Sequence, residues 1–178
     1  MVNSPVARVL ILFNDDGGRL AQIARCVYAG AQKAGVEDCV LLSFSQVRYS
    51  GGQQPLNSFD LIFLQADFAK LFSKKAAAEI PLDALEGRNV AVYGLCSNSH
   101  SSKQRFKDFV ARLESAGVTV KNTLMLHVKG LLSFAGRGAL DEIDFIRAEA
   151  FGERTTNYFT GRRVAMQSEK ARISGYRK

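Results

Sequence analysis

A short apolar run followed at once by a glycine loop constrains this chain more than any other feature. Residues 9–13 read VLILF, residues 14–18 read NDDGG, and apolar residues then recur at helical spacing as far as Gly35. Such apolar runs are typical of strands buried on both faces of a parallel sheet, and a glycine commonly ends a helix. The segment predicts strand, turn and helix. Ligands of open α/β sheets bind beside such loops, so we expect function here.

The rest of the chain repeats this alternation. Further apolar segments predict strands over residues 39–45, 59–65, 89–95 and 118–128. Helices are expected over 68–79, 103–116 and 140–151, a short helical turn at 81–85, and loops at 50–55, 96–102 and 130–138. Ile143, Ile146 and Ala150 share one face of the last helix and are expected to pack inward. Five strands alternating with helices predict a parallel sheet covered on both faces, with right-handed crossovers.

The composition predicts a cytoplasmic protein with a sizeable core. The chain has 178 residues, 47% of them hydrophobic, and shows neither a signal peptide nor an apolar run long enough to span a membrane. Its three cysteines, Cys26, Cys39 and Cys96, are an odd number without metal-ligand spacing. That usage fits a reducing compartment rather than a disulfide framework, and we expect no metal site.

The net charge of +7 is concentrated at the C-terminus. Residues 1–153 hold 17 Lys and Arg against 16 Asp and Glu, whereas residues 154–178 hold 7 against 1. We therefore expect a domain over 1–153 and a basic tail over 154–178. The tail mixes its charges with Tyr158, Phe159 and Tyr176, which suits docking on an acidic protein or a nucleic acid. Packing of Tyr158 and Phe159 on the body or on a second subunit of a homodimer is the alternative.

Residues 84–118, ALEGRNVAVYGLCSNSHSSKQRFKDFVARLESAGV, resemble a segment of the flavodoxin-like family. In that family the segment ends a strand at a flavin-contacting loop and continues through a helix to a glycine turn. The resemblance extends from Val6 to Glu153. It implies an α/β fold of three layers around a doubly wound five-stranded parallel sheet, with strand order 2-1-3-4-5. It also implies non-covalent binding of FMN and a part in electron or hydride transfer with a redox partner protein.

The resemblance places the FMN phosphate at the first loop. The matching positions are Asn14, Asp15, Asp16, Gly17, Gly18, Arg19 and Leu20. The family's Ser/Thr-x-Thr-Gly-x-Thr pattern is replaced here by NDDGGRL, so hydroxyl donors are missing and two carboxylates face the phosphate position. Ionised carboxylates cannot donate hydrogen bonds and repel a phosphate. Backbone amides and the Arg19 guanidinium remain as donors.

The flavin ring is expected between the loops that follow the third and fourth strands. Phe68, in the loop 65–68, matches the aromatic that stacks on the ring, although a phenylalanine that opens a helix is also typical of a core anchor. The loop after the fourth strand supplies Cys96, Ser97, Asn98 and His100. His100 matches a position that covers the other flavin face, and its alternative is a solvated loop histidine. Cys96 is equally typical of a buried thiol.

Two other interpretations stay open. The acidic NDDGGRL loop favours a flavodoxin-like domain that has lost FMN and acts as a binding or assembly module. Asp15 and Asp16 also resemble the Mg²⁺-holding pair of phosphoryl-accepting receiver domains. The third strand ends in Leu64-Gln65, which cannot be phosphorylated, so only a degenerate receiver is compatible. His127 lies in the apolar run LMLHV and is predicted to be a core histidine.

Overall fold

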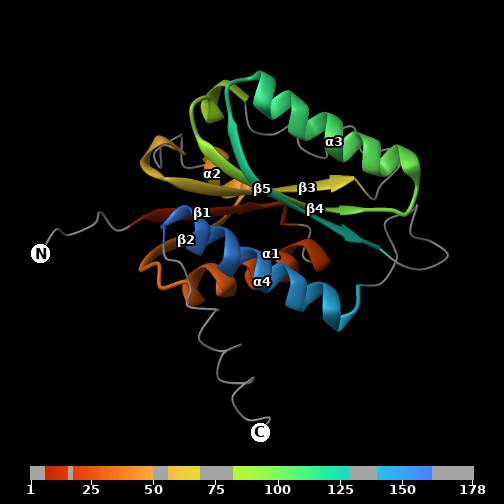
Figure 1. Cartoon of the computed structure of the whole chain (residues 1–178), viewed down its shortest axis with the longest axis horizontal. Helices are drawn as coiled ribbons and strands as arrows, with labels where there is room; N and C mark the ends of the chain where they lie inside the picture. Colours follow the sequence, from red (N-terminus) through yellow and green to blue (C-terminus); the bar gives the residue numbers. More distant parts are fainter. Residues whose placement is uncertain (1–6, 16–17, 50–55, 69–81, 129–139, 162–178) are drawn as a thin grey trace, which may run out of the picture.

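Five parallel strands form the centre of the molecule. The computed structural model describes residues 7–15, 18–49, 56–68, 82–128 and 140–161. Its strands are β1 (Arg8–Phe13), β2 (Asp38–Ser43), β3 (Leu61–Phe68), β4 (Asn89–Cys96) and β5 (Thr119–His127). They pair in parallel in the order β2-β1-β3-β4-β5 (Figure 1). This order confirms the predicted doubly wound sheet.

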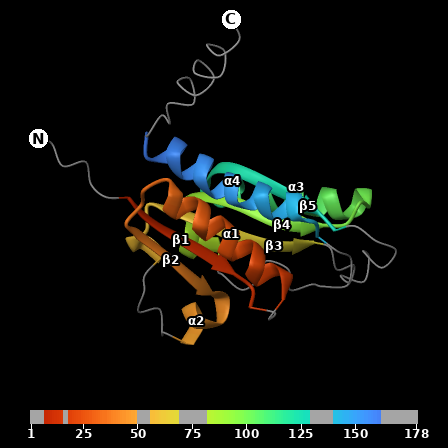
Figure 2. The same cartoon turned by 90° about the horizontal axis from the view of Figure 1, so that it is seen from below.

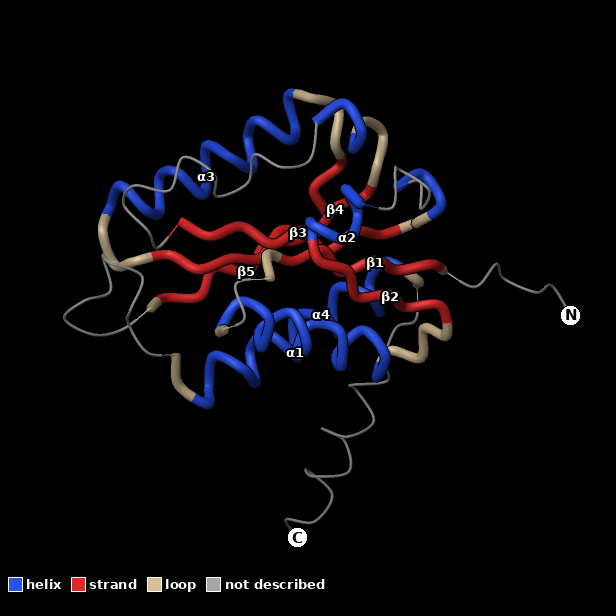
Figure 3. The backbone as a smooth tube through the Cα atoms, turned by 180° about the vertical axis from the view of Figure 1, so that it is seen from behind, coloured by secondary structure: helices blue, strands red, loops and turns tan. Residues whose placement is uncertain are grey.

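Helices cover both faces of the sheet and complete three layers. They are α1 (Arg19–Lys33), α2 (Phe44–Tyr49), α3 (His100–Ser115) and α4 (Glu142–Phe159), with short 3₁₀ turns η1 (Leu56–Ser58) and η2 (Leu82–Leu85). α1 and α4 lie side by side under one face, whereas α3 covers the other (Figures 1 and 2). Seen from behind, the strands are enclosed between the two helical layers (Figure 3).

Alternation along the central strands divides the interior into two apolar cores. In β1, Val9 and Ile11 belong to the core under α1 and α4, while Leu10 and Leu12 belong to the core under α3. The ring of Phe63 in β3 packs edge to face on an α4 phenylalanine with centroids 5.7 Å apart. Because β1, β3 and β4 are buried on both faces, they read in sequence as continuous apolar runs rather than alternating ones.

α1 and α4 approach each other closely through two glycines. A Cβ built on Gly30 would lie 1.9 Å from the carbonyl oxygen of Glu149, and one built on Gly152 would lie 2.1 Å from that of Val27. An ion pair between Lys33 and Glu149 also links the two helices. The glycines therefore set the spacing between the two helices, because any side chain at either position would push the backbones apart.

The predicted helix ends are confirmed at two glycines. Gly35 follows α1 with φ of 77°, and Gly117 follows α3 with φ of 79°. Both are left-handed conformations that glycine adopts at low cost. At the other end of α3, the Ser99 side chain accepts a hydrogen bond from the Ser102 backbone N–H. α4 begins with a capping box formed by Asp141 and Asp144.

The third strand is longer than the sequence predicted. β3 continues to Phe68 because Ala66, Asp67 and Phe68 pair in register with Gly94, Leu95 and Cys96 of β4. The predicted loop over 65–68 is therefore strand, and the predicted helix does not begin at Phe68. The remaining residues of that helix, and the loops predicted over 50–55 and 130–138, lie outside the described residues.

The fourth helix corrects two predictions. Ile143 and Ile146, expected to pack inward, are 64% and 60% exposed. The inward face instead carries small and polar residues such as Ala148 and Thr155 together with phenylalanines, of which Phe151 is buried and Phe145 and Phe159 are partly buried. The two isoleucines therefore indicated the wrong face. α4 also continues to Phe159, and the boundary predicted after Glu153 consequently falls inside a helix. Residues 162–178 of the predicted tail lie outside the described part.

Two smaller differences concern helix starts. Phe44 and Ser45 were expected to end the second strand but begin the short helix α2. α3 begins at His100, inside the predicted loop 96–102, because Ser99 provides its N-cap. Among the described residues, no helix combines the length and the apolar character needed to cross a membrane.

Candidate functional site

The candidate site lies where β1 ends and α1 begins. β1 sits between β2 and β3 in the sheet. The strand order therefore reverses at β1, and such a switch point leaves a crevice at the carboxyl edge of the sheet. Asn14 and Asp15 follow β1 and are exposed, and Gly18 is the N-cap of α1. Arg19 and Leu20 open that helix, whereas residues 16–17 lie outside the described part of the loop.

The buried side chain of Gln65 holds both ends of this loop. Gln65 lies in β3 and is 1% exposed. Its Oε1 accepts a hydrogen bond from the Asn14 backbone N–H at 2.9 Å, and its Nε2 donates to the Leu20 carbonyl oxygen at 2.8 Å. The hydroxyl of Tyr93 in β4 donates to the Leu12 carbonyl oxygen at 3.3 Å, just before the loop. These hydrogen bonds anchor the loop to β3 and β4 of the sheet.

The N-terminus of α1 is suited to an anion. Its first turn, Arg19 to Gln22, contains no acidic residue, and its N-cap Gly18 has no side chain to occupy the helix N–H groups. The helix dipole adds partial positive charge at this end. Leu20 is buried in the core, so it contributes only its backbone to the loop. The exposed Asp15 carboxylate adds negative charge nearby and opposes an anionic ligand.

A serine network fixes the turn between β4 and α3. The Ser97 backbone N–H donates to Ser102 Oγ at 3.0 Å, and this hydroxyl donates to the Phe68 carbonyl oxygen at 2.6 Å. Ser97 Oγ lies 2.8 Å from Ser99 Oγ. Ser97 is buried, whereas Asn98 and His100 are exposed at the same edge of the sheet. Of the predicted ring contacts, Asn98 and His100 therefore have side chains open to a ligand.

Phe68 and Cys96 point into the core instead. The Phe68 ring packs edge to face on Phe106 with centroids 5.7 Å apart and also contacts Phe109. Phe68 therefore anchors the core, and its ring is not placed to stack on a flavin. Burial, the largest effect, raises the pKa of the Cys96 thiol to about 11. The thiol is protonated at neutral pH and is not an activated nucleophile.

His127 ends β5 opposite Cys96 in the sheet register and is half-buried. Burial, and then the positive charges of Lys103 and Arg147, lower its pKa, so the imidazole is neutral at neutral pH. Its Nδ1 is buried without a hydrogen-bond partner among the described residues. Within those same residues, no group of three or more His, Cys, Asp or Glu side chains could hold a metal ion.

Two positioning residues were missed at the sequence level. The sequence patterns place Gln65 at the end of the third strand and in the loop 65–68, and Ser102 at the end of a loop, without a positioning role for either. A glutamine inside the apolar run FDLIFLQ was a usable signal, because a buried amide requires hydrogen-bond partners. Ser102 gave no such signal, because it is one of four serines in the stretch SNSHSS.

The strand order and the three layers define a flavodoxin-like α/β fold. A flavodoxin-like domain from a Synechococcus sp. protein superimposes with a TM-score of 0.60 at 16% identity, covering 86% of this chain and 99% of that one. A flavodoxin from Streptococcus pneumoniae TIGR4 gives 0.60 at 17% identity, with coverages of 85% and 99%. The Flv1 flavodiiron core from Synechocystis sp. gives 0.62 at 12% identity, with coverages of 88% and 37%.

These likenesses establish the flavodoxin-like fold. No protein-family model matches the sequence, and no curated protein matches it either. At such low identity the fold is shared while the chemistry of the loops must be argued from this chain's own residues.

Proposed function

We propose that this protein binds FMN non-covalently at the carboxyl edge of its sheet and takes part in electron or hydride transfer. One observation carries the proposal. The loop between β1 and α1 is anchored at both ends by Gln65, and it presents a helix N-terminus at the switch point of the sheet. Flavodoxins and a flavodiiron core are among the similar structures, which supports the choice of ligand.

The residues present fit the phosphate through the backbone rather than through hydroxyl groups. The N–H groups of the first turn of α1 and the Arg19 guanidinium would hold it. Gln65 contributes by keeping the loop in place, so that little ordering is required on binding. Asp15 reduces the affinity, because a carboxylate near a phosphate dianion is repelled.

The ring would lie toward the turn between β4 and α3. There Asn98 and His100 are exposed, and the serine network holds the turn against the end of β3. FMN, when bound, supplies one- and two-electron chemistry that no side chain of this site offers. A redox partner protein is part of this proposal, and the basic residues near the C-terminus favour an acidic partner or a nucleic acid.

Burial of Phe68 favours a second candidate function. The Phe68 ring packs in the core, so it is not open to stack on a flavin. The exposed Asp15 carboxylate lies in the loop where a flavin site is expected to offer hydrogen-bond donors to the phosphate. The alternative is a flavodoxin-like binding or assembly module without cofactor. A folded protein without measurable affinity for flavin would favour this candidate over the first.

Comparing FMN with riboflavin tests the proposed site. Riboflavin lacks the phosphate, so we expect FMN to bind at least about tenfold tighter, which corresponds to about 1.4 kcal/mol. Quenching of flavin fluorescence on titration with the protein measures both affinities. Equal affinities would place the phosphate outside the helix N-terminus, and the absence of quenching by either ligand would leave the binding-module candidate.

A further inference from the structure

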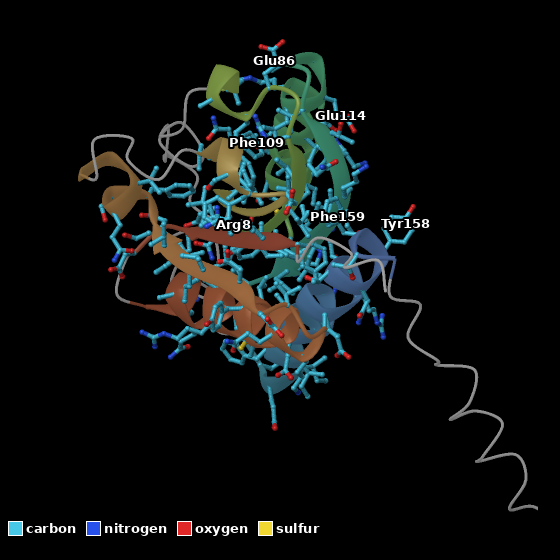
Figure 4. All side chains as sticks on the ribbon, turned by 90° about the vertical axis from the view of Figure 1, so that its left-hand side faces the viewer. Arg8, Glu86, Phe109, Glu114, Tyr158 and Phe159 are labelled. Atoms are coloured by element: carbon cyan, nitrogen blue, oxygen red, sulfur yellow. The ribbon has the colours of Figure 1, made fainter. Side chains whose placement is uncertain are left out.

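The outward face of α4 exposes large apolar side chains. Ile143 and Ile146 are 64% and 60% exposed, and Ala150 follows one turn later on the same face. Tyr158 is 78% exposed and projects away from the body near the end of the helix (Figure 4). Among the described residues, these two isoleucines and Tyr158 are the only large hydrophobic side chains that are exposed.

This face cannot be turned into the core of its own domain. The buried residues of α4, among them Ala148, Phe151 and Thr155, lie on the opposite side of the helix. Gly152 fixes that side against α1, because a Cβ built on it would lie only 2.1 Å from the Val27 carbonyl oxygen. Ile143 and Ile146 therefore stay outward in any arrangement that keeps the contact between α1 and α4.

We propose that this face of α4 is the contact of a homodimer, in which two copies of the helix lie parallel about a two-fold axis. Ile143, Ile146 and Ala150 are spaced as the a, d and a positions of a heptad, the pattern that brings two helices together along one seam. The seam ends at the next d position, which is Glu153. This inference does not depend on FMN binding.

Charges on both flanks of the seam select the second copy as the partner. Arg147 and Arg154 occupy the e positions on one flank, and Glu142 and Glu149 occupy the g positions on the other. In a parallel pair the g residue of one helix meets the e residue of the next heptad on the other. Glu142 then faces Arg147 of the second copy and Glu149 faces Arg154, and the symmetry repeats both pairs.

The same charges oppose the antiparallel alternative. When two copies of a helix run in opposite directions, each flank meets the same flank of the other copy. Arginine would then face arginine, and glutamate would face glutamate, which is destabilising. Within one chain, Arg147 lies 3.5 Å from Asp144 Oδ1 and Glu149 pairs with Lys33. In the dimer, Arg147 would meet Glu142 of the second copy and Glu149 would meet Arg154, in addition to these contacts within the chain.

The contact is small, so the dimer should be weak. A seam of two isoleucines and one alanine per copy buries less surface than a standard stable interface. We expect the mass measured by sedimentation to double between about 5 and about 500 µM protein, a range typical of such a contact.

Variants along the outward face of α4 test the seam. Ile146→Asp should keep the protein monomeric over the whole range with an unchanged circular dichroism spectrum, and Glu153→Leu should lower the dimer dissociation constant by extending the seam.

Glu142→Arg and Arg147→Glu should each weaken the dimer, while the double variant should restore it. Arg112→Glu on the exposed side of α3 serves as the matched control and should leave the mass unchanged.

Cross-linking tests the direction of the helices. Residue 143 meets its own copy in the parallel pair, so Ile143→Cys should form a disulfide-linked dimer under mild oxidation. In the antiparallel pair the two copies of residue 143 would lie about 15 Å apart along the seam, beyond disulfide reach. A monomer at every concentration overturns the proposal. So does a dimer that Ile146→Asp leaves intact, or a dimer in which Ile143→Cys fails to cross-link.

Discussion

Gln65 shows how one buried side chain determines the shape of a loop on a neighbouring element. Its amide satisfies one backbone donor at Asn14 and one backbone acceptor at Leu20, both in the connection from β1 to α1. A buried group left without its partner costs more than the hydrogen bond contributes, about 1–3 kcal/mol. The loop therefore takes its conformation from β3 as well as from its own sequence.

Replacing Gln65 should uncouple the loop from the sheet. In Gln65→Leu both backbone groups lose their partner, so we expect the free energy of unfolding to fall by about 2–4 kcal/mol and FMN affinity to fall about tenfold. Urea unfolding and fluorescence titration measure the two effects. Gln104→Leu, at an exposed glutamine on α3 that bonds Asp108, should change neither quantity. An unchanged affinity in Gln65→Leu would show that the loop does not need this anchor.

Asp15 has the opposite role, because its charge opposes the proposed ligand. Asp15→Asn should tighten FMN binding by about three- to tenfold, which corresponds to removing roughly 1 kcal/mol of repulsion at the surface. The gain should shrink in about 1 M salt, where the Debye length is only about 3 Å. Weaker binding in Asp15→Asn would contradict the account and would mean that the carboxylate supports the loop.

At the scale of elements, the pair α1 and α4 is held by backbone contact. Gly30 and Gly152 each meet a carbonyl oxygen of the other helix, as the two helices lie side by side in Figure 2. Phe159, at the end of α4, packs against the apolar core between this helix pair and the sheet (Figure 4). This close approach lets the helix pair cover one face of the sheet although the inward side of α4 is largely small and polar.

A methyl group at either glycine should separate the helices. In Gly152→Ala the added Cβ would meet the Val27 carbonyl oxygen, and overpacking of this kind costs about 1–3 kcal/mol, more when backbone must move. The loss should exceed the gain of about 1 kcal/mol that alanine gives in a helix interior. Thermal unfolding should show a Tm lower by several degrees. Gln22→Ala, on the exposed side of α1, should leave the Tm nearly unchanged. A stabilised Gly152→Ala would contradict the close contact.

The sequence predicted the elements better than the faces they bury. Apolar runs and terminal glycines located all five strands and the ends of α1 and α3, because these signals depend on local chemistry. The inward side of α4 could not be predicted, since Gly152 is buried where α1 approaches and Thr155 accepts a hydrogen bond from Asn122 of β5, and both neighbours lie far along the chain. Likewise Phe68 was assigned to a loop because its pairing with Cys96 depends on β4, which lies far along the chain.

At the scale of the whole molecule, the sheet buries groups that ionise only at high pH. Burial raises the pKa of Cys39 to about 12, with a contribution from Asp38, and that of Cys96 to about 11. Burial also raises the pKa of Tyr93. In the unfolded chain a thiol titrates near pH 8.5 and a tyrosine near 10. The folded protein therefore keeps protons that the unfolded chain releases.

Stability should consequently fall in alkaline solution. Above about pH 8.5 the unfolded state binds fewer protons than the folded state, so the free energy of unfolding decreases as pH rises toward 11. Urea midpoints at pH 7, 9 and 10 measure the decrease. Cys39→Ala/Cys96→Ala should be less stable at pH 7 but should show a shallower decline. An equally steep decline in the double variant would exclude the two thiols as its cause.

The absorbance spectrum after incubation with FMN and gel filtration tests the central claim most directly. We expect the protein to elute with the paired absorption bands of an oxidised flavin, and Gln65→Leu to retain less flavin under the same conditions. A folded protein that elutes colourless after incubation with excess FMN would contradict flavin binding. The anchored loop would then belong to a flavodoxin-like domain that binds something else.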